Sequence, residues 1–136
     1  MSKSNALEND VLALVFNATA LPGAYGSNLF VSLHTGDPGE AGDQTTNEAT
    51  YTGYARVTVS RDSAGWTVTG NTAVNTAAIT FPQCTGGTNT ITHWAVGTAT
   101  SGAGRLLYKG SLTASLAVSN LITPQLLATT LQIQED

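Results

Sequence analysis

Short segments in which apolar and polar residues alternate with a period of two constrain this chain most. Such alternation places apolar side chains on one face of a β-strand and polar ones on the other. It is clearest in four segments, residues 29–34, 55–60, 91–96 and 112–118. Breaks that contain Gly or Asn separate the segments, and a turn is predicted at Gly110. The pattern predicts an all-β (mainly β) fold, an antiparallel β-sandwich, jelly-roll-like, of about eight strands.

The N-terminal residues follow a different period and predict one α-helix at residues 5–18. Apolar residues recur at helical spacing, at Leu7, Val11, Leu14 and Val15. Asn5 and Glu8 have the spacing of a capping box, and Pro22-Gly23 ends the pattern. The apolar stripe of this helix has to cover either the β-core or a partner, and the sequence leaves both alternatives open.

The length of 136 residues suits a single domain, which we expect to span residues 1–136. Within it, the helix takes residues 5–18, the β-sandwich residues 28–134 and a long loop residues 35–53. The single cysteine, Cys84, has no internal partner for a disulfide. No residue pattern calls for a cofactor, so none is expected.

The charge pattern argues against several classes of partner. Only 10% of the residues are charged, and the net charge is −4. The five basic residues are scattered, so we expect no binding to nucleic acid or to an anionic membrane. Glu8, Asn9 and Asp10 interrupt the N-terminal apolar residues, so no signal peptide is expected. No apolar run reaches the ~18 residues of a membrane span.

The long loop is the best local candidate for a contact surface, because long loops in compact domains are usually functional or disordered. Four residues are candidates for a protein interface: Asp37, Glu40, Tyr51 and Tyr54. Tyr51 and Tyr54 could equally pack where the next strand begins. The loop's carboxylates, which also include Asp43 and Glu48, match no calcium-loop spacing, although a weak cation site stays open.

No constellation in the sequence points to catalysis. His34 and His93 lie in predicted strands without a neighbouring metal ligand, and Cys84 has no nearby cation to activate it. No Gly-x-Ser-x-Gly motif is present. Trp66 is expected to pack into the sandwich. We therefore expect neither catalytic nor metal-binding residues, and no enzyme.

Several motifs together resemble the small structural proteins of tailed bacteriophages. They are LHTGDPGEAG at 33–42, YTGYAR at 51–56, GWTVTGN at 65–71, AITFP at 78–82 and GAGRLLYKGSL at 102–112. Members of this family are often labelled tail fibre proteins. Others of similar length are capsid cement or decoration proteins with a jelly-roll body.

This resemblance implies a non-enzymatic virion structural protein. We expect a capsid cement protein that binds the outside of the major capsid protein lattice and bridges capsomers. Self-association as a homodimer or homotrimer is also expected. Such a protein would be made in the bacterial host cytoplasm and reside on the capsid surface of the virion. The alternative is a tail-fibre or receptor-binding module, for which exposed Trp66 or Trp94 could contact host glycans.

Overall fold

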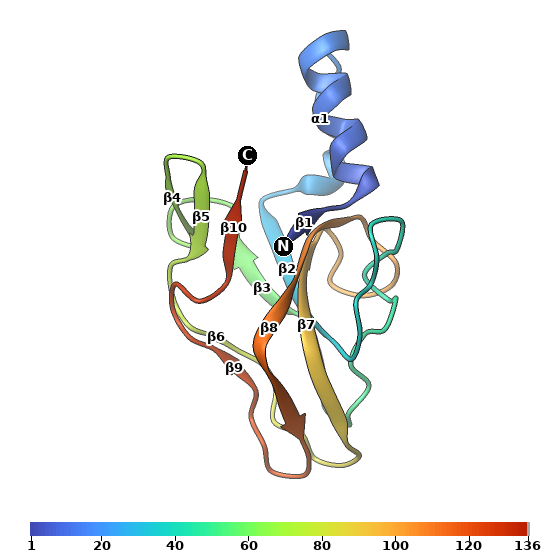
Figure 1. Ribbon diagram of the computed structural model, residues 1–136, viewed down its shortest axis with the longest axis vertical. Coiled ribbons are helices and arrows are strands. Elements are labelled where there is room, and N and C mark those ends of the chain that lie inside the picture. Colours follow the sequence, from blue (N-terminus) through green and yellow to red (C-terminus); the bar gives the residue numbers. More distant parts are fainter. Residues whose placement is uncertain (136) are drawn as a thin grey trace.

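The computed structural model describes residues 1–135 and is built mainly from short antiparallel strands (Figure 1). One α-helix, α1 (Asn5–Asn17), and one 3-10 helix (Gly23–Tyr25) precede most of them. The strands are β1 (Ser2–Lys3), β2 (Asn28–His34), β3 (Val57–Ser60), β4 (Trp66–Thr69), β5 (Thr72–Asn75), β6 (Ile79–Thr80), β7 (Asn89–Gly97), β8 (Leu106–Val118), β9 (Gln125–Leu126) and β10 (Gln132–Gln134). The predicted mainly β sandwich with an N-terminal helix is confirmed.

The strands form a large sheet and two smaller ones. The large sheet has the order β1-β8-β7-β2-β3, and the smaller sheets have the orders β10-β5-β4 and β6-β9. Side chains from all three sheets meet in one buried cluster, which includes Leu33, Phe81, Ile91 and Leu131. In Figure 1 the small sheets lie across from the large sheet, and α1 stands at one end of the body.

One strand lies outside the predicted sandwich range of residues 28–134. Strand β1 precedes α1 and pairs with β8, with Ser2 opposite Lys109 and Lys3 opposite Tyr108. Two residues are too few to show a period, so the sequence carried no signal for this strand. Its pairing ties the start of the chain to the edge of the large sheet.

The predicted turn at Gly110 is wrong, because β8 runs unbroken from Leu106 to Val118. Gly110 faces Trp94 on β7 in the ladder. A Cβ added at Gly110 would lie 2.4 Å from Cζ2 of that indole. The glycine therefore makes room for an aromatic ring that crosses the strand, and it does not reverse the chain.

Helix α1 forms where the sequence predicts it but begins with a different cap. The N-cap is Ser4, whose Oγ accepts a hydrogen bond from the Leu7 N–H at 3.3 Å. The predicted capping box of Asn5 and Glu8 is therefore wrong, because Ser4 and not Asn5 caps the helix. The Ser4 N–H also donates to the Leu107 carbonyl at 2.9 Å, which fixes the start of α1 to β8. At the other end, Ala18 adopts a left-handed conformation with φ 51.

Candidate interaction surface

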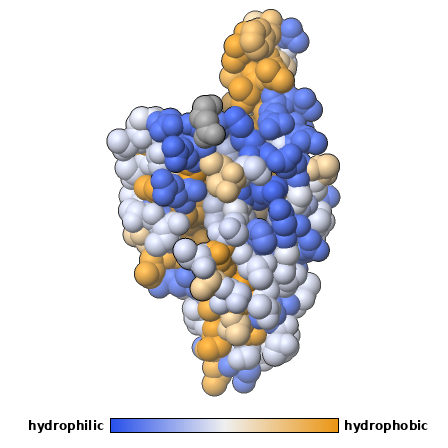
Figure 2. Space-filling model, in the orientation of Figure 1, coloured by the Kyte–Doolittle hydropathy of each residue, from blue (hydrophilic) through white to orange (hydrophobic). Residues whose placement is uncertain are grey.

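Helix α1 projects from the body instead of covering it (Figure 1). Leu7 is the buried residue of the helix, and the apolar side chains beyond it face solvent. Phe16 is 77% exposed, Val15 65% and Leu12 54%. Figure 2 shows the resulting apolar surface around the tip of α1. Of the two alternatives left open by the sequence, the structure thus excludes the β-core as the cover for this half of the helix.

The exposed half of α1 is apolar on every side. Residues 11–16 read VLALVF without a polar interruption. Because an α-helix has 3.6 residues per turn, six consecutive residues go around its whole circumference. A helix that faces solvent on one side normally carries a polar face there, whereas a helix that is apolar all round is a buried one. The tip of α1 therefore has the composition of a segment enclosed by protein.

The base of α1 is held rigidly by a small apolar cluster and an ion pair. Leu7 packs with Tyr25 and Leu107. The Tyr25 hydroxyl donates to Oδ2 of Asp10 at 2.9 Å, and Nη2 of Arg105 lies 2.6 Å from Oδ1 of Asp10. Burial, and then the hydrogen bond to Asp10, raise the pKa of Tyr25 to about 12. These contacts orient the helix while leaving its tip uncovered.

An apolar groove of about 540 Å³ opens between the large sheet and the β10-β5-β4 sheet. Its walls include Leu29, Leu107 and Tyr108 from the large sheet and Trp66, Val68 and Ile133 from the smaller one. Leu29 and Tyr108 also pack against the cluster at the base of α1. The groove and the projecting helix therefore lie at the same end of the body.

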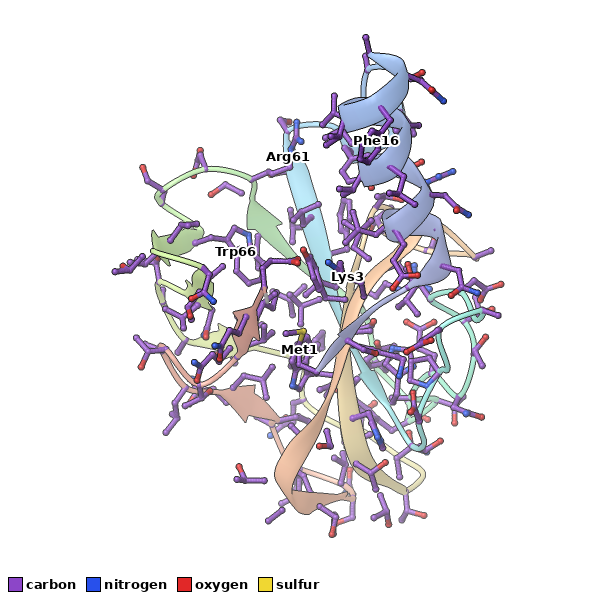
Figure 3. The ribbon with its side chains drawn as sticks, turned by 45° about the horizontal axis from the view of Figure 1, so that its top comes forward. Met1, Lys3, Phe16, Arg61 and Trp66 are labelled. Atoms are coloured by element: carbon purple, nitrogen blue, oxygen red, sulfur yellow. The ribbon has the colours of Figure 1, made fainter. Side chains whose placement is uncertain are left out.

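Two polar groups in the wall and at the rim of the apolar groove lack partners. Trp66 is only 9% exposed, yet its indole Nε1 has no hydrogen-bond partner among residues 1–135. Arg61 lines the groove and forms no ion pair with any described carboxylate. Each of the other four basic side chains forms an ion pair with a carboxylate: Lys3–Glu135, Arg56–Glu48, Arg105–Asp10 and Lys109–Asp37. Figure 3 shows Trp66 on the side of the body that bears β4 and β5, and Arg61 beside the start of β2, between Trp66 and Phe16 on α1.

Of the four residues predicted at an interface, Asp37 and Glu40 lie at the surface. The Asp37 carboxylate accepts a hydrogen bond from the Gly39 N–H at 2.8 Å and pairs with Nζ of Lys109 at 3.0 Å. The Gly39 N–H first, and then Lys109, lower the pKa of Asp37. The Glu40 carbonyl accepts from the Asn5 N–H at 3.0 Å, which joins the loop to the base of α1. A partner contact of these two residues stays a prediction.

Tyr51 and Tyr54 pack inward, as strand-entry residues do. Tyr51 is 3% exposed, and its hydroxyl donates to the Pro82 carbonyl at 2.9 Å. The Tyr54 hydroxyl donates to Oε1 of Glu48 at 2.9 Å and accepts from the Leu33 N–H at 3.1 Å. Burial raises the pKa of both phenols, that of Tyr51 to about 12. In this structure their rings stabilise the body, so a role in a partner contact stays a prediction.

The predicted long loop is a packed segment that runs from residue 35 to residue 56, where β3 follows. The Arg56 guanidinium is buried and pairs with both carboxylate oxygens of Glu48, at 2.6 and 2.8 Å. It also donates to the carbonyls of Ala99 and Gly102. Gln44 is fully buried, and its Oε1 accepts from the Ala99 N–H at 2.9 Å. We name this stretch, residues 35–56, the packed loop.

The residues considered for metal or thiol chemistry are held in structural contacts. His34 and His93 are register partners in the β2–β7 ladder. His34 is fully buried, with Nε2 2.8 Å from the Ser32 hydroxyl and Nδ1 2.9 Å from the Thr46 carbonyl, and burial lowers its pKa. Cys84 is buried and free. Within residues 1–135, no three His, Cys, Asp or Glu side chains come together as a metal site.

Trp66 and Trp94, considered as exposed glycan platforms for the fibre alternative, are both buried. Trp94 is 5% exposed and crosses Gly110, and Trp66 packs in the core as predicted. A sugar ring would need an exposed aromatic face on which to stack. That expectation is corrected here, because neither indole offers such a face in this structure.

Sequence reasoning did not identify the apolar groove or the isolation of the helix tip. The apolar groove is formed by residues from β2, β4, β5, β7, β8 and β10, which the chain brings together only on folding. The helix tip did carry a signal, because an unbroken apolar stretch at residues 11–16 is wider than the stripe a surface helix needs.

Comparison with known proteins now assigns the chain to a class. The sequence matches, over residues 2–134, the protein family described as Podophage GP4 fiber I protein gp80. The match spans nearly the whole chain, so this chain belongs to that family of phage structural proteins of the fibre type. The resemblance to phage virion proteins is confirmed, whereas the capsid cement role stays a prediction. No curated protein matches the sequence. No helix of residues 1–135 is both long and apolar enough to cross a membrane.

Proposed function

We propose that this protein is a non-enzymatic structural subunit of a phage particle, held there through its apolar end. The apolar end comprises residues 11–16 of α1 and the apolar groove beside the base of α1. The observation that carries the proposal is the projecting tip, whose five large apolar side chains between residues 11 and 16 are all exposed. Large exposed apolar patches mark protein interaction sites, because leaving them in water costs free energy. Membership of a phage fibre family supplies the setting.

The first location that we propose is the capsid, as a cement protein that contacts the major capsid protein and bridges capsomers. The charge-poor surface supports this location, because covering a neutral hydroxyl side chain costs less free energy than covering a charged one. Exposed Thr67 and Thr69 on β4 are of this kind. A subunit that binds the assembled lattice and not its separate parts would stabilise the lattice by mass action.

The second location is the tail, as part of a fibre or as a receptor-binding module. The description of the matching family as a fibre protein favours it. A projecting helix can fix a small β-body to a tail structure as well as to a capsid. Because Trp66 and Trp94 are buried, any host contact would use other side chains.

One experiment on purified particles tests the function and separates the two locations. Stained gels of the particles give the copy number of the chain relative to the major capsid protein, and immunogold labelling shows its position. A strong band with label over the head supports the cement role, and a faint band with label at the tail supports the fibre role. Absence of the chain from washed particles would contradict the proposed function.

A further inference from the structure

We propose that the tip of α1 in one copy of the chain inserts into the apolar groove of a second copy, so that two chains exchange helices in a two-fold dimer. The inference deepens the proposed function, on which it rests for its setting in the particle, by naming a partner of the apolar end. The dimer itself can be tested without any particle.

The first argument is that the chain carries both halves of an apolar contact at one end. Residues 11–16 form a convex surface, and the apolar groove is concave and lined mainly by apolar side chains. In a two-fold dimer the same patch occurs on both chains, so one helix–groove contact implies its symmetric copy. A helix laid in an apolar groove is also a common mode of protein recognition.

The second argument is the size of the surfaces. Five large apolar side chains of α1 are exposed together, and contiguous apolar patches above a few hundred Å² mark interaction sites. A stable interface buries about 800 Å² on each partner. The two helix–groove contacts of a dimer supply a large part of this area, and the surfaces of the two bodies that meet around them would supply the rest. With 13 residues, α1 is about 20 Å long, so it reaches well beyond its own base.

The third argument is that residues 1–135 leave the apolar groove of their own chain unfilled. The helix is fixed at its base by Leu7 and by the Asp10–Arg105 ion pair, and it points away from the body (Figure 1). Phe16 is consequently the most exposed of the large apolar side chains. A neighbouring copy can present the same tip from outside, where the groove is open.

The fourth argument is polar complementarity. The last carbonyls of an α-helix lack donors within the helix and carry a partial negative charge. The last turn of α1 has no basic side chain to offset that charge. The apolar groove supplies a cation for that end, namely the exposed Arg61 guanidinium, which has no carboxylate partner among residues 1–135. The end of a helix inserted from a second copy would bring its free carbonyls to this guanidinium.

Disulfide trapping between two singly substituted chains tests the geometry directly. We would mix Phe16→Cys with Val68→Cys under mild oxidation and distinguish the two chains by a size tag. Val68 is 70% exposed and lines the groove, and Cys84 is fully buried in both chains. A disulfide needs Cα atoms within about 7 Å, so only a tip seated in the groove joins residue 16 to residue 68. The mixed dimer is the expected product.

Charged variants show whether the same contact holds the native chain together. We expect the wild-type chain to be a dimer by light scattering at high concentration, and Phe16→Glu and Val68→Glu each to be monomers. Leu127→Glu is the matched control, because Leu127 is 60% exposed and does not line the groove. It should stay a dimer. Circular dichroism checks that all three variants remain folded.

Several results would overturn the inference. One is a wild-type chain that stays monomeric at its highest soluble concentration. Another is Phe16→Cys pairing only with itself, which would indicate a helix-to-helix bundle. A third is a dimer that survives both charged substitutions. If the dimer fails while the chain is found in particles, the partner of α1 is another virion protein and the proposed function stands. If the dimer forms but particles lack the chain, the proposed function fails alone.

Discussion

The packed loop is irregular but partly buried, whereas helix α1 is regular but exposed at its tip. The packed loop has no strand of its own, yet it contains buried Gln44, Tyr51 and Arg56. Helix α1 is fully regular, yet its side chains from residue 11 to residue 16 are largely exposed. The comparison teaches that an irregular segment can be buried when most of its polar groups find partners inside the body, as those of Tyr51 and Arg56 do. Regular hydrogen bonding along the backbone does not by itself provide a cover for apolar side chains.

The largest expected effect on stability lies in the packed loop. Arg56→Ala would leave the Glu48 carboxylate and the carbonyls of Ala99 and Gly102 without their donor. Breaking a buried ion pair in this way costs about 3–5 kcal/mol. Urea unfolding followed by fluorescence measures the loss. The control Arg61→Ala removes an exposed guanidinium without an ion pair to residues 1–135, and should leave monomer stability nearly unchanged. Equal losses would contradict this reading of the packed loop.

Leu7 and Phe16 divide α1 into an anchored base and a free tip. Leu7→Ala removes a buried side chain between Tyr25 and Leu107 and should cost about 3 kcal/mol. Phe16→Ala should change the free energy of unfolding by less than about 0.5 kcal/mol in dilute, monomeric protein. Both values come from the same urea titration. A large loss for Phe16→Ala would mean that the tip already packs on its own body.

Substitutions at Gly110 and Gly23 compare the closely packed body with the open end that bears α1. Gly110→Ala should destabilise by about 1–3 kcal/mol, because the new methyl meets the Trp94 ring. Gly23→Ala is the control, since a Cβ there has no atom within 4 Å. Thermal unfolding of the two variants should therefore differ. Equal melting temperatures would show that β8 and Trp94 can separate without cost.

His34, the last residue of β2, gives the contact between β2 and the packed loop a pH dependence. Burial lowers the pKa of His34, so the unfolded chain binds a proton more readily than the folded one. This contribution to stability is complete above the unfolded pKa of about 6.5 and is lost as the pH falls below it. We expect the urea midpoint to fall between pH 7 and pH 5, and to fall less in His34→Asn. An identical slope in the variant would refute the assignment.

The sequence predicted most of the secondary structure, because strand alternation and helical spacing are local signals. It placed α1 within one residue of its observed end and gave the mainly β sandwich. The predicted turn at Gly110 was wrong, because glycine is needed there to leave room for the Trp94 ring on the neighbouring strand. The periodicity of one strand does not show which residue of a distant strand will lie opposite it, so such contacts could not be predicted.

The candidate surface was less predictable for the same reason. Asp37 and Glu40 were correctly placed at the surface from their polarity and loop position. Tyr51, in contrast, is buried, and its hydroxyl contacts the Pro82 carbonyl, 31 residues further along the chain. The apolar groove requires six strands in their final positions. The apolar stretch at residues 11–16 was visible, but only the structure shows that nothing in the described chain covers it.

The most direct test concerns whether the tip of α1 is needed for assembly. Particles would be purified from cells that make Phe16→Glu or the control Leu127→Glu in place of the natural chain. The content of this chain relative to the major capsid protein would then be measured on gels. We predict that the Phe16→Glu chain, although folded, is missing from particles, while Leu127→Glu is present at the natural level. Normal incorporation of Phe16→Glu would contradict the account.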